Sequence, residues 1–157
     1  MEDSQFVTLE QAIKLRKLGF RDYCYQHYDA AGTLCDNYIS IPSYDIICVS
    51  SLLKSFNNYK NITDKWDTPT LSQVQDWLIK VKGLVICPCP EAKFVKDKED
   101  YKNSKFIHTG WVFDIFVITS DNRLTNNPNK KEKILYSSFN EALSAGINTC
   151  LEILEKT

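Results

Sequence analysis

Apolar residues recur at helical spacing in two segments of the chain. Near the C-terminus, one face of a helix would carry Leu143, Gly146, Ile147, Cys150, Leu151 and Leu154. An earlier stripe would carry Leu71, Val74, Trp77, Leu78 and Val81. These patterns predict helices over Phe139–Lys156 and Leu71–Lys82, and a third helix is expected over Leu9–Leu18. Gly146 in mid-helix indicates close approach to another element, because Gly is otherwise unfavourable there.

Each predicted helix begins with a capping box. A Thr or Ser precedes a Gln or Glu by three residues in Thr8–Gln11, Thr70–Gln73 and Ser138–Glu141. In a capping box the hydroxyl accepts a hydrogen bond from the third helical amide, and the longer side chain accepts one from the amide of the cap residue. Gly19 and Gly83 follow the first two helices, as expected where a helix ends in a left-handed conformation.

β-Branched and aromatic residues predict several strands. The expected strands are Tyr23–Tyr28, Thr33–Ile39, Leu84–Cys89, Lys105–Thr119 and Lys133–Tyr136. A turn at 29–32 would join the first two, polar loops at 96–104 and 120–132 would join the later ones, and Gly110 predicts a bend or bulge in the longest strand. Residues 40–69 follow neither period, so no element is predicted there.

The order of these elements predicts an α+β domain. After residue 69 the order helix, strand, strand, strand, helix favours an antiparallel sheet of about four or five strands with helices packed on one face. We expect one domain over residues 1–157, with an N-terminal helix, hairpin and irregular segment in 1–62 and the core in 63–157. A hydrophobic content of 43% is enough to form that core without metal or disulfides.

Composition narrows the class of function. The chain carries 19 basic and 20 acidic residues, a net charge of −1. This balance disfavours sequence-independent nucleic-acid binding, which depends on neutralising phosphates. The acidic start MEDSQ lacks the features of a signal peptide, and the apolar stretches are too short to span a bilayer. We therefore expect a cytoplasmic protein whose six cysteines are thiols.

Cys87 and Cys89 are weak candidates for metal ligands. They form a C-x-C pair on a predicted strand, so both side chains would share one face. Zinc sites usually use C-x-x-C pairs, and the sequence contains none, so buried thiols are the favoured interpretation. A cysteine nucleophile would need a base, for which only His27 and His108 are available. No metal and no cofactor is expected.

Two prolines and one carboxylate mark the neighbouring strands. Pro88 and Pro90 cannot donate to a ladder, so their strand is expected at a sheet edge or to end there. Asp114 interrupts an apolar run, and a place at a sheet edge or end is favoured over a buried functional carboxylate. The sequence holds no Gly-rich phosphate loop, nucleophile elbow or metalloprotease motif, so we expect no catalytic residues and no enzyme activity.

Two groups of residues are candidates for binding. The first group is aromatic and surrounds the predicted hairpin: Tyr23, Tyr25 and Tyr28. Tyrosine-rich surfaces suit protein recognition because the ring offers contact area at small entropic cost. The second group is basic and lies on the Asn-rich loop: Arg123, Lys130 and Lys131. Basic loops beside aromatic strands suit single-stranded nucleic acid.

The chain resembles a known group of proteins in two segments, PTLSQVQDWLIKVKGLVI and SFNEALSAGINTCLEILEK. The residues that carry the resemblance are Pro69, Thr70, Leu71, Gln75, Trp77, Leu78, Gly83, Ala142, Leu143, Gly146 and Ile147. The group consists of uncharacterised small proteins of phages and prophages in Bacteroides-type gut bacteria. The resemblance covers the second half of the chain and, more weakly, the predicted first helix. It implies a phage-type accessory protein in a bacterial cytoplasm and implies no catalytic residue.

Three functional hypotheses follow from the sequence. The leading hypothesis is a non-enzymatic accessory protein that binds a macromolecular partner, with a protein favoured, either a host factor or a second copy of the chain. One alternative is a nucleic-acid-binding module that uses the basic loop 120–133. The other is a small zinc or thiol protein built on Cys87 and Cys89. No membrane association is expected.

Overall fold

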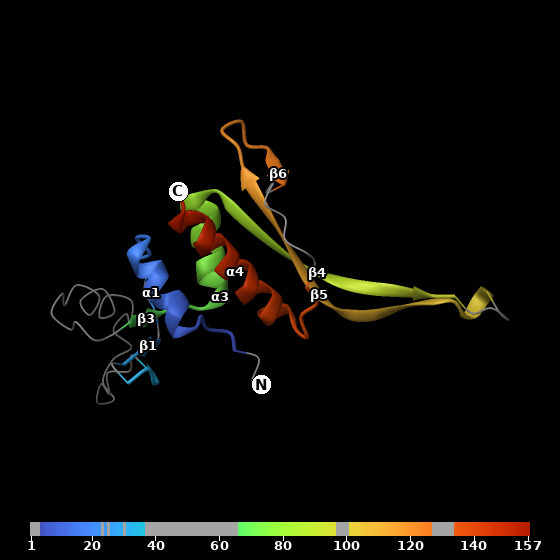
Figure 1. Ribbon diagram of the computed structural model, residues 1–157, viewed down its shortest axis with the longest axis horizontal. Helices are drawn as coiled ribbons and strands as arrows, with labels where there is room; N and C mark the ends of the chain where they lie inside the picture. The colour runs from blue at the N-terminus through green and yellow to red at the C-terminus, as the bar shows by residue number, and fades with distance from the viewer. Residues whose placement is uncertain are drawn as a thin grey trace, which may run out of the picture.

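The structure is a computed structural model that describes residues 4–22, 24, 26–29, 31–36, 66–96, 101–126 and 134–157. A helical head lies at one side of the molecule, and a long two-stranded arm projects from it (Figure 1). No helix among the described residues has the length and apolar character needed to cross a membrane.

The described helices begin where the sequence predicts. They are α1 (Leu9–Lys17), α3 (Leu71–Trp77) and α4 (Phe139–Glu155). The capping boxes at the starts of α1 and α3 are complete, with both reciprocal hydrogen bonds present. The third box is only half formed, because the Glu141 carboxylate accepts from the Ser137 amide (3.0 Å) and hydroxyl instead of from the Ser138 amide.

The second predicted helix changes its winding before it ends. α3 continues into a π-helix, η1 (Leu78–Lys82), which stops at left-handed Gly83. A π-turn carries more residues per turn than an α-helix, so it rotates the side chains that follow it. Val81, predicted on the buried stripe, is therefore 60% exposed, and that expectation was wrong.

A small antiparallel sheet forms beside α1. It contains β1 (Gln26–Tyr28), β2 (Leu34–Asp36) and β3 (Trp66–Thr68) in the order β2-β1-β3. The β1–β2 hairpin agrees with the predicted hairpin. β3 comes from a segment in which the sequence predicts no element, because three residues are too few to display a period.

The second antiparallel sheet contains β4 (Leu84–Val95), β5 (Lys105–Ile118) and β6 (Leu124–Asn126) in that order. The α+β class is confirmed, but the single sheet of four or five strands with helices on one face was wrong, because the described strands divide into two three-stranded sheets. Of the strand expected at 133–136, the structure describes residues 134–136, which contribute a bridge between Tyr136 and Trp111.

The core of the head lies between α4, the inner parts of β4 and β5, and the other two helices. α4 crosses one face of the β4–β5 pair, and α1 and α3 pack against α4 (Figure 1). The predicted face of α4 is confirmed, since Leu143, Ile147, Cys150 and Leu151 are at most 1% exposed. Leu84, Ile86 and Ile115 close the same core from the sheet.

Gly146 is the point of closest approach between α4 and the sheet. A β-carbon added there would lie 2.5 Å from Ile86 Cγ2 and 3.3 Å from Phe113 Cδ2. These distances explain a glycine in mid-helix, because a side chain would overlap the strand.

Gly146→Ala is therefore expected to lower the free energy of unfolding by about 1–3 kcal/mol, although alanine favours helix more than glycine does. Chemical denaturation measures the change. The same substitution in an Ile86→Ala background is expected to be neutral or stabilising, because Ile86 Cγ2 is gone. An equal loss in both backgrounds would contradict the contact.

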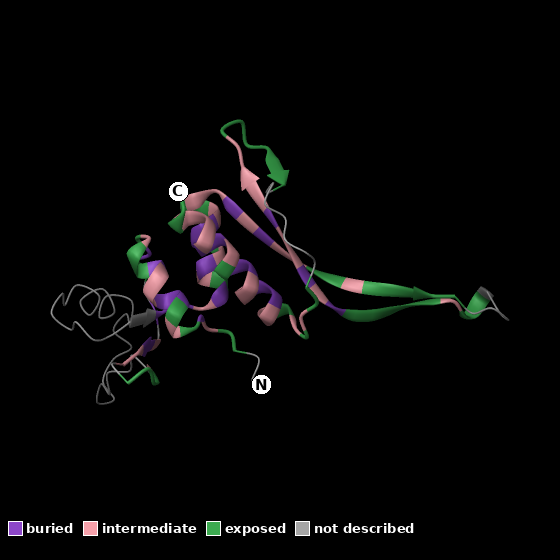
Figure 2. Ribbon diagram, viewed as in Figure 1, coloured by how far each residue is buried: buried purple, intermediate pink, exposed green. Residues whose placement is uncertain are grey.

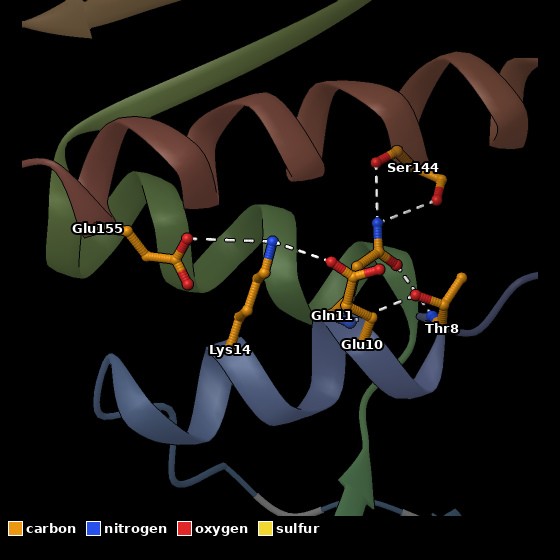
Figure 3. A network of polar contacts seen from close by, with 6 residues as sticks. All are labelled: Thr8, Glu10, Gln11, Lys14, Ser144 and Glu155. Atoms are coloured by element: carbon orange, nitrogen blue, oxygen red, sulfur yellow. Dashed lines mark hydrogen bonds and ion pairs between the residues drawn. The ribbon is translucent and has the colours of Figure 1, made fainter. Parts of the chain in front are cut away.

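Polar groups join α1 to α4 (Figure 3). Gln11 is fully buried; its Nε2 donates to the backbone oxygen (3.0 Å) and the hydroxyl (3.2 Å) of Ser144, while its Oε1 accepts from the Thr8 amide. Lys14 lies 3.1 Å from Glu10 and 3.9 Å from Glu155 on α4. Gln11 therefore caps its own helix and fixes the neighbouring one.

Trp77 anchors α3 in the head. It is 5% exposed, and its ring meets Phe20 edge-on at 5.6 Å.

Trp77→Ala is expected to cost about 3–5 kcal/mol of unfolding free energy, through lost burial and a cavity. Thr70→Ala removes only the helix cap and is expected to cost about 1 kcal/mol. Denaturant titration of the two variants tests this order, and a smaller loss for Trp77→Ala would contradict the packing.

Candidate functional site

The arm is the outer part of the β4–β5 pair. The two strands stay paired from the head to Val95↔Lys105, beyond which lies a short 3-10 helix, η2 (Tyr101–Asn103). A register shift between Glu91 and Ala92 divides the pair, since Glu91 faces Gly110 while Ala92 faces His108. Nearly all described residues beyond this shift are exposed, as Figure 2 shows in green.

The shift is a β-bulge in which Thr109 is the extra residue, so the bulge predicted near Gly110 is confirmed. Gly110 has a φ of +156°, and a β-carbon there would lie 2.9 Å from the Tyr136 oxygen. Only glycine fits this backbone, because a side chain would be strained and would strike the neighbouring segment.

One face of the arm continues the core-facing side of the sheet. The bulge brings His108 to the side of Trp111, and their rings are 5.7 Å apart. The Trp111 ring also meets Phe139, at the start of α4, at 5.5 Å. Further out, Phe94 and Phe106 pair across the strands at 5.0 Å and are 51% and 74% exposed. We call Phe94, Phe106 and His108 the aromatic face of the arm.

The opposite face combines lysines with aliphatic residues. Lys93 faces Ile107 and Val95 faces Lys105 across the strands. All four are exposed, Val95 at 40% and Ile107 at 43%. We call this the lysine face. The two faces alternate along each strand because successive side chains point to opposite sides.

The inner edge of β4 is closed to a further strand. Ile118 N donates to Gly83 O (2.8 Å), which fixes the ladder so that Ile86, Pro88 and Pro90 direct their backbone groups away from β5. Gln75 Nε2 donates to the Ile86 oxygen (2.9 Å), and the prolines have no N–H to offer. Pro88 and Pro90 thus lie on an edge strand as expected, but they do not end it.

The inner edge of β5 is covered as well. Trp111 and Tyr136 exchange both backbone hydrogen bonds, at 2.9 and 2.8 Å. Nearer the head end of the sheet, Phe116–Ile118 pairs with β6. In the described part of the chain, the inner sheet therefore presents little open backbone, whereas both edges of the outer arm are open.

Of the predicted tyrosine group, the structure describes Tyr28, which lies in the small sheet away from the arm. Tyr28 on β1 is half-buried, its hydroxyl donates to the Val7 oxygen (3.1 Å), and burial raises its pKa. Its contacts describe a packing role in the head. Tyr23 and Tyr25 lie outside the described residues.

Of the predicted basic group, the structure describes Arg123, which lies at the turn between β5 and β6. Arg123 is exposed, and its Nε is 3.1 Å from Asp121. Lys130 and Lys131 lie outside the described residues. The structure therefore places only one member of this group, and that residue is paired with a carboxylate.

Cys87 and Cys89 share the sheet face turned away from α4, as their spacing predicts. Cys87 is opposite Asp114; burial, reinforced by Cys89 and Asp114, raises the pKa of the Cys87 thiol. Asp114 lies mid-strand in central β5, so its expected place at an edge or end was wrong. Cys89 is exposed, so the buried-thiol interpretation was wrong for it. Among the described residues, no three His, Cys, Asp or Glu side chains are grouped to hold a metal.

The aromatic face was missed as a site because the predicted strand stopped at Cys89. The alternation in EAKFV (91–95) was the available signal. Comparison with known proteins found no matching family, no matching curated protein and no matching solved structure.

Unlike the exposed Cys89, Cys150 is a core thiol, and burial raises its pKa from 9.0 to about 12. Because the folded pKa lies above the unfolded one, the buried thiol stabilises the fold below pH 9, and that stability is lost as the pH rises toward 12. Unfolding free energy is expected to fall by about 1.4 kcal/mol per pH unit in this window. Cys150→Ala should flatten this dependence of unfolding free energy on pH, measured by urea titration at each pH, whereas Cys89→Ala, at an exposed site, should not. Equal slopes for the two variants would contradict the burial of Cys150.

Proposed function

We propose that this chain is a non-enzymatic protein-binding module whose contact surface is the outer arm. The observation that carries the proposal is the aromatic face, which prolongs the core-facing side of the sheet beyond the start of α4 and is exposed there. A sheet side that packs a helix in the head and continues uncovered on an arm is suited to packing against another molecule.

The composition of the arm supports this role. Aromatic residues dominate the energetics of protein interfaces because they bury large areas with few rotatable bonds. Four large apolar side chains are exposed beyond the bulge: Phe94, Val95, Phe106 and Ile107. Phe94 and Phe106 form a patch on the aromatic face, and Val95 and Ile107 form a second patch on the lysine face. Both patches lie on two paired strands, which fix the backbone and reduce the entropy lost on binding.

The charge of the arm favours a protein over a nucleic acid. Residues 91–108 contain five lysines, at 93, 96, 98, 102 and 105, and four carboxylates, at 91, 97, 99 and 100, which leaves +1 (5 − 4). Affinity for a phosphate backbone grows with the number of phosphates neutralised. An excess of one positive charge therefore supports little affinity for nucleic acid.

The resemblance to small phage and prophage proteins suggests the biological context in which this binding module acts. The residues that carry it have structural roles, since Gln75 protects the edge of β4 and Gly146 seats α4 on the sheet. We propose that the chain is a phage-type accessory protein that acts in a bacterial cytoplasm and meets its partner through the arm.

Replacing both phenylalanines tests the proposal. Phe94→Ser with Phe106→Ser is expected to reduce capture of a stoichiometric partner from bacterial lysate by more than about tenfold, because truncating a residue that dominates an interface costs about 2 kcal/mol or more. Quantitative mass spectrometry of material retained by the immobilised protein measures the loss. The thermal unfolding midpoint should hardly move, because both rings are exposed.

Leu124→Ser is the matched control. Leu124 on β6 is 59% exposed and lies off the arm, so its replacement removes apolar surface without touching the aromatic face. Its capture profile should equal that of the wild type. Equal capture by all three proteins would refute the arm as the contact surface.

A further inference from the structure

The open edge of β4 on the arm has the same backbone orientation as the protected inner edge. The extra residue of the bulge is Thr109 on β5, so the alternation along β4 is unbroken. Ala92 and Phe94 therefore direct their N–H and C=O groups away from β5, as Pro88 and Pro90 direct theirs. Unlike the prolines, both residues have an N–H to donate. The outer edge of β4 is thus able to accept a strand, whereas its inner edge is not.

A strand added at this edge would extend both faces of the arm. Its side chains would alternate between the aromatic face, beside Phe94, and the lysine face, beside Lys93 and Val95, with Lys105 one strand further away opposite Val95. Apolar side chains suit the first position, and carboxylates suit the second, because cross-strand pairs of opposite charge are favourable.

We propose that the outer edge of β4, residues 92–95, binds an extended segment of another protein in which apolar and acidic residues alternate. This inference rests on the proposed protein-binding function and specifies its mode: backbone hydrogen bonds from the edge, with the two faces selecting the side chains.

A second copy of the arm does not fit this edge. Pairing two arms through β4 would bring Lys93 of one copy close to Lys93 of the other, with Lys105 on the neighbouring strand of the same face. Like charges on adjacent strands are destabilising, and lysines on an edge strand are a known protection against self-pairing. The occupant is therefore an acidic partner.

A short capped peptide of alternating valine and glutamate is the probe, and the matched peptide has lysine in place of glutamate. With the acidic peptide, amide hydrogen exchange of Ala92 and Phe94 in the full chain is expected to slow by about tenfold or more, because these amides become hydrogen-bonded. The lysine peptide should leave the exchange unchanged. Equal effects of the two peptides, or no protection at either amide, overturn the proposal.

Ala92→Pro extends the Pro88, Pro90 series by one outward position and leaves the β4–β5 ladder in place. It is expected to weaken binding of the acidic peptide by about tenfold or more, whereas Ala92→Ser, which keeps the N–H, should stay within about twofold of wild type. If Ala92→Pro does not fold, Lys93→Glu with Lys105→Glu replaces it, and the preference should move to the lysine peptide. Unchanged binding in either test overturns the proposal.

Capture of the cellular partner separates this inference from the function on which it rests. If Ala92→Pro retains the partner while Phe94→Ser with Phe106→Ser loses it, the aromatic face binds without strand addition, and only the present proposal fails. If both variants retain the partner, the proposed function fails as well. Loss in both, with retention by Ala92→Ser, supports the two together.

Discussion

The contact between α4 and the β4–β5 pair at Gly146 is the constraint on which the rest of the structure depends. Because Gly146 has no side chain, the helix lies close enough to Ile86 and Phe113 to close the core against the sheet. α1 and α3 then pack on α4, and Gln11 fixes α1 to it through two hydrogen bonds. α4 begins at Phe139, and among the described residues no helix covers the same sheet side beyond that point.

The helices were predictable because their signals are local. A capping box needs four consecutive residues, and the apolar face of α4 repeats within its own 17 residues. Even here the prediction failed at Val81, where the helix widens into a π-turn that the spacing of apolar residues does not indicate.

The division of the strands was less accessible, because pairing is decided between residues far apart in sequence. β1 pairs with β3 across a segment that shows no hydrophobic period, and no local pattern near Trp66 indicates the pairing. The arm was missed for a different reason. Pro88 and Pro90 correctly indicated an edge strand, but proline ends a strand only where its N–H would face the partner. Here both face outward, so β4 continues to Val95.

The way the sheet protects its edges distinguishes stability from binding. An open edge invites aggregation, and the part that projects farthest from the head is the most accessible to other chains. If protection alone governed the sequence, the prolines would be expected on the outer arm, where no element in the described part of the chain covers the backbone. They lie instead on the inner edge, which Gln75 also protects at Ile86, and the outer edge carries Lys93. Proline excludes every added strand, whereas lysine excludes a basic one and admits an acidic one. The outer arm therefore disfavours pairing with a second copy of itself and still presents open backbone groups. A selective strand-binding edge requires both properties.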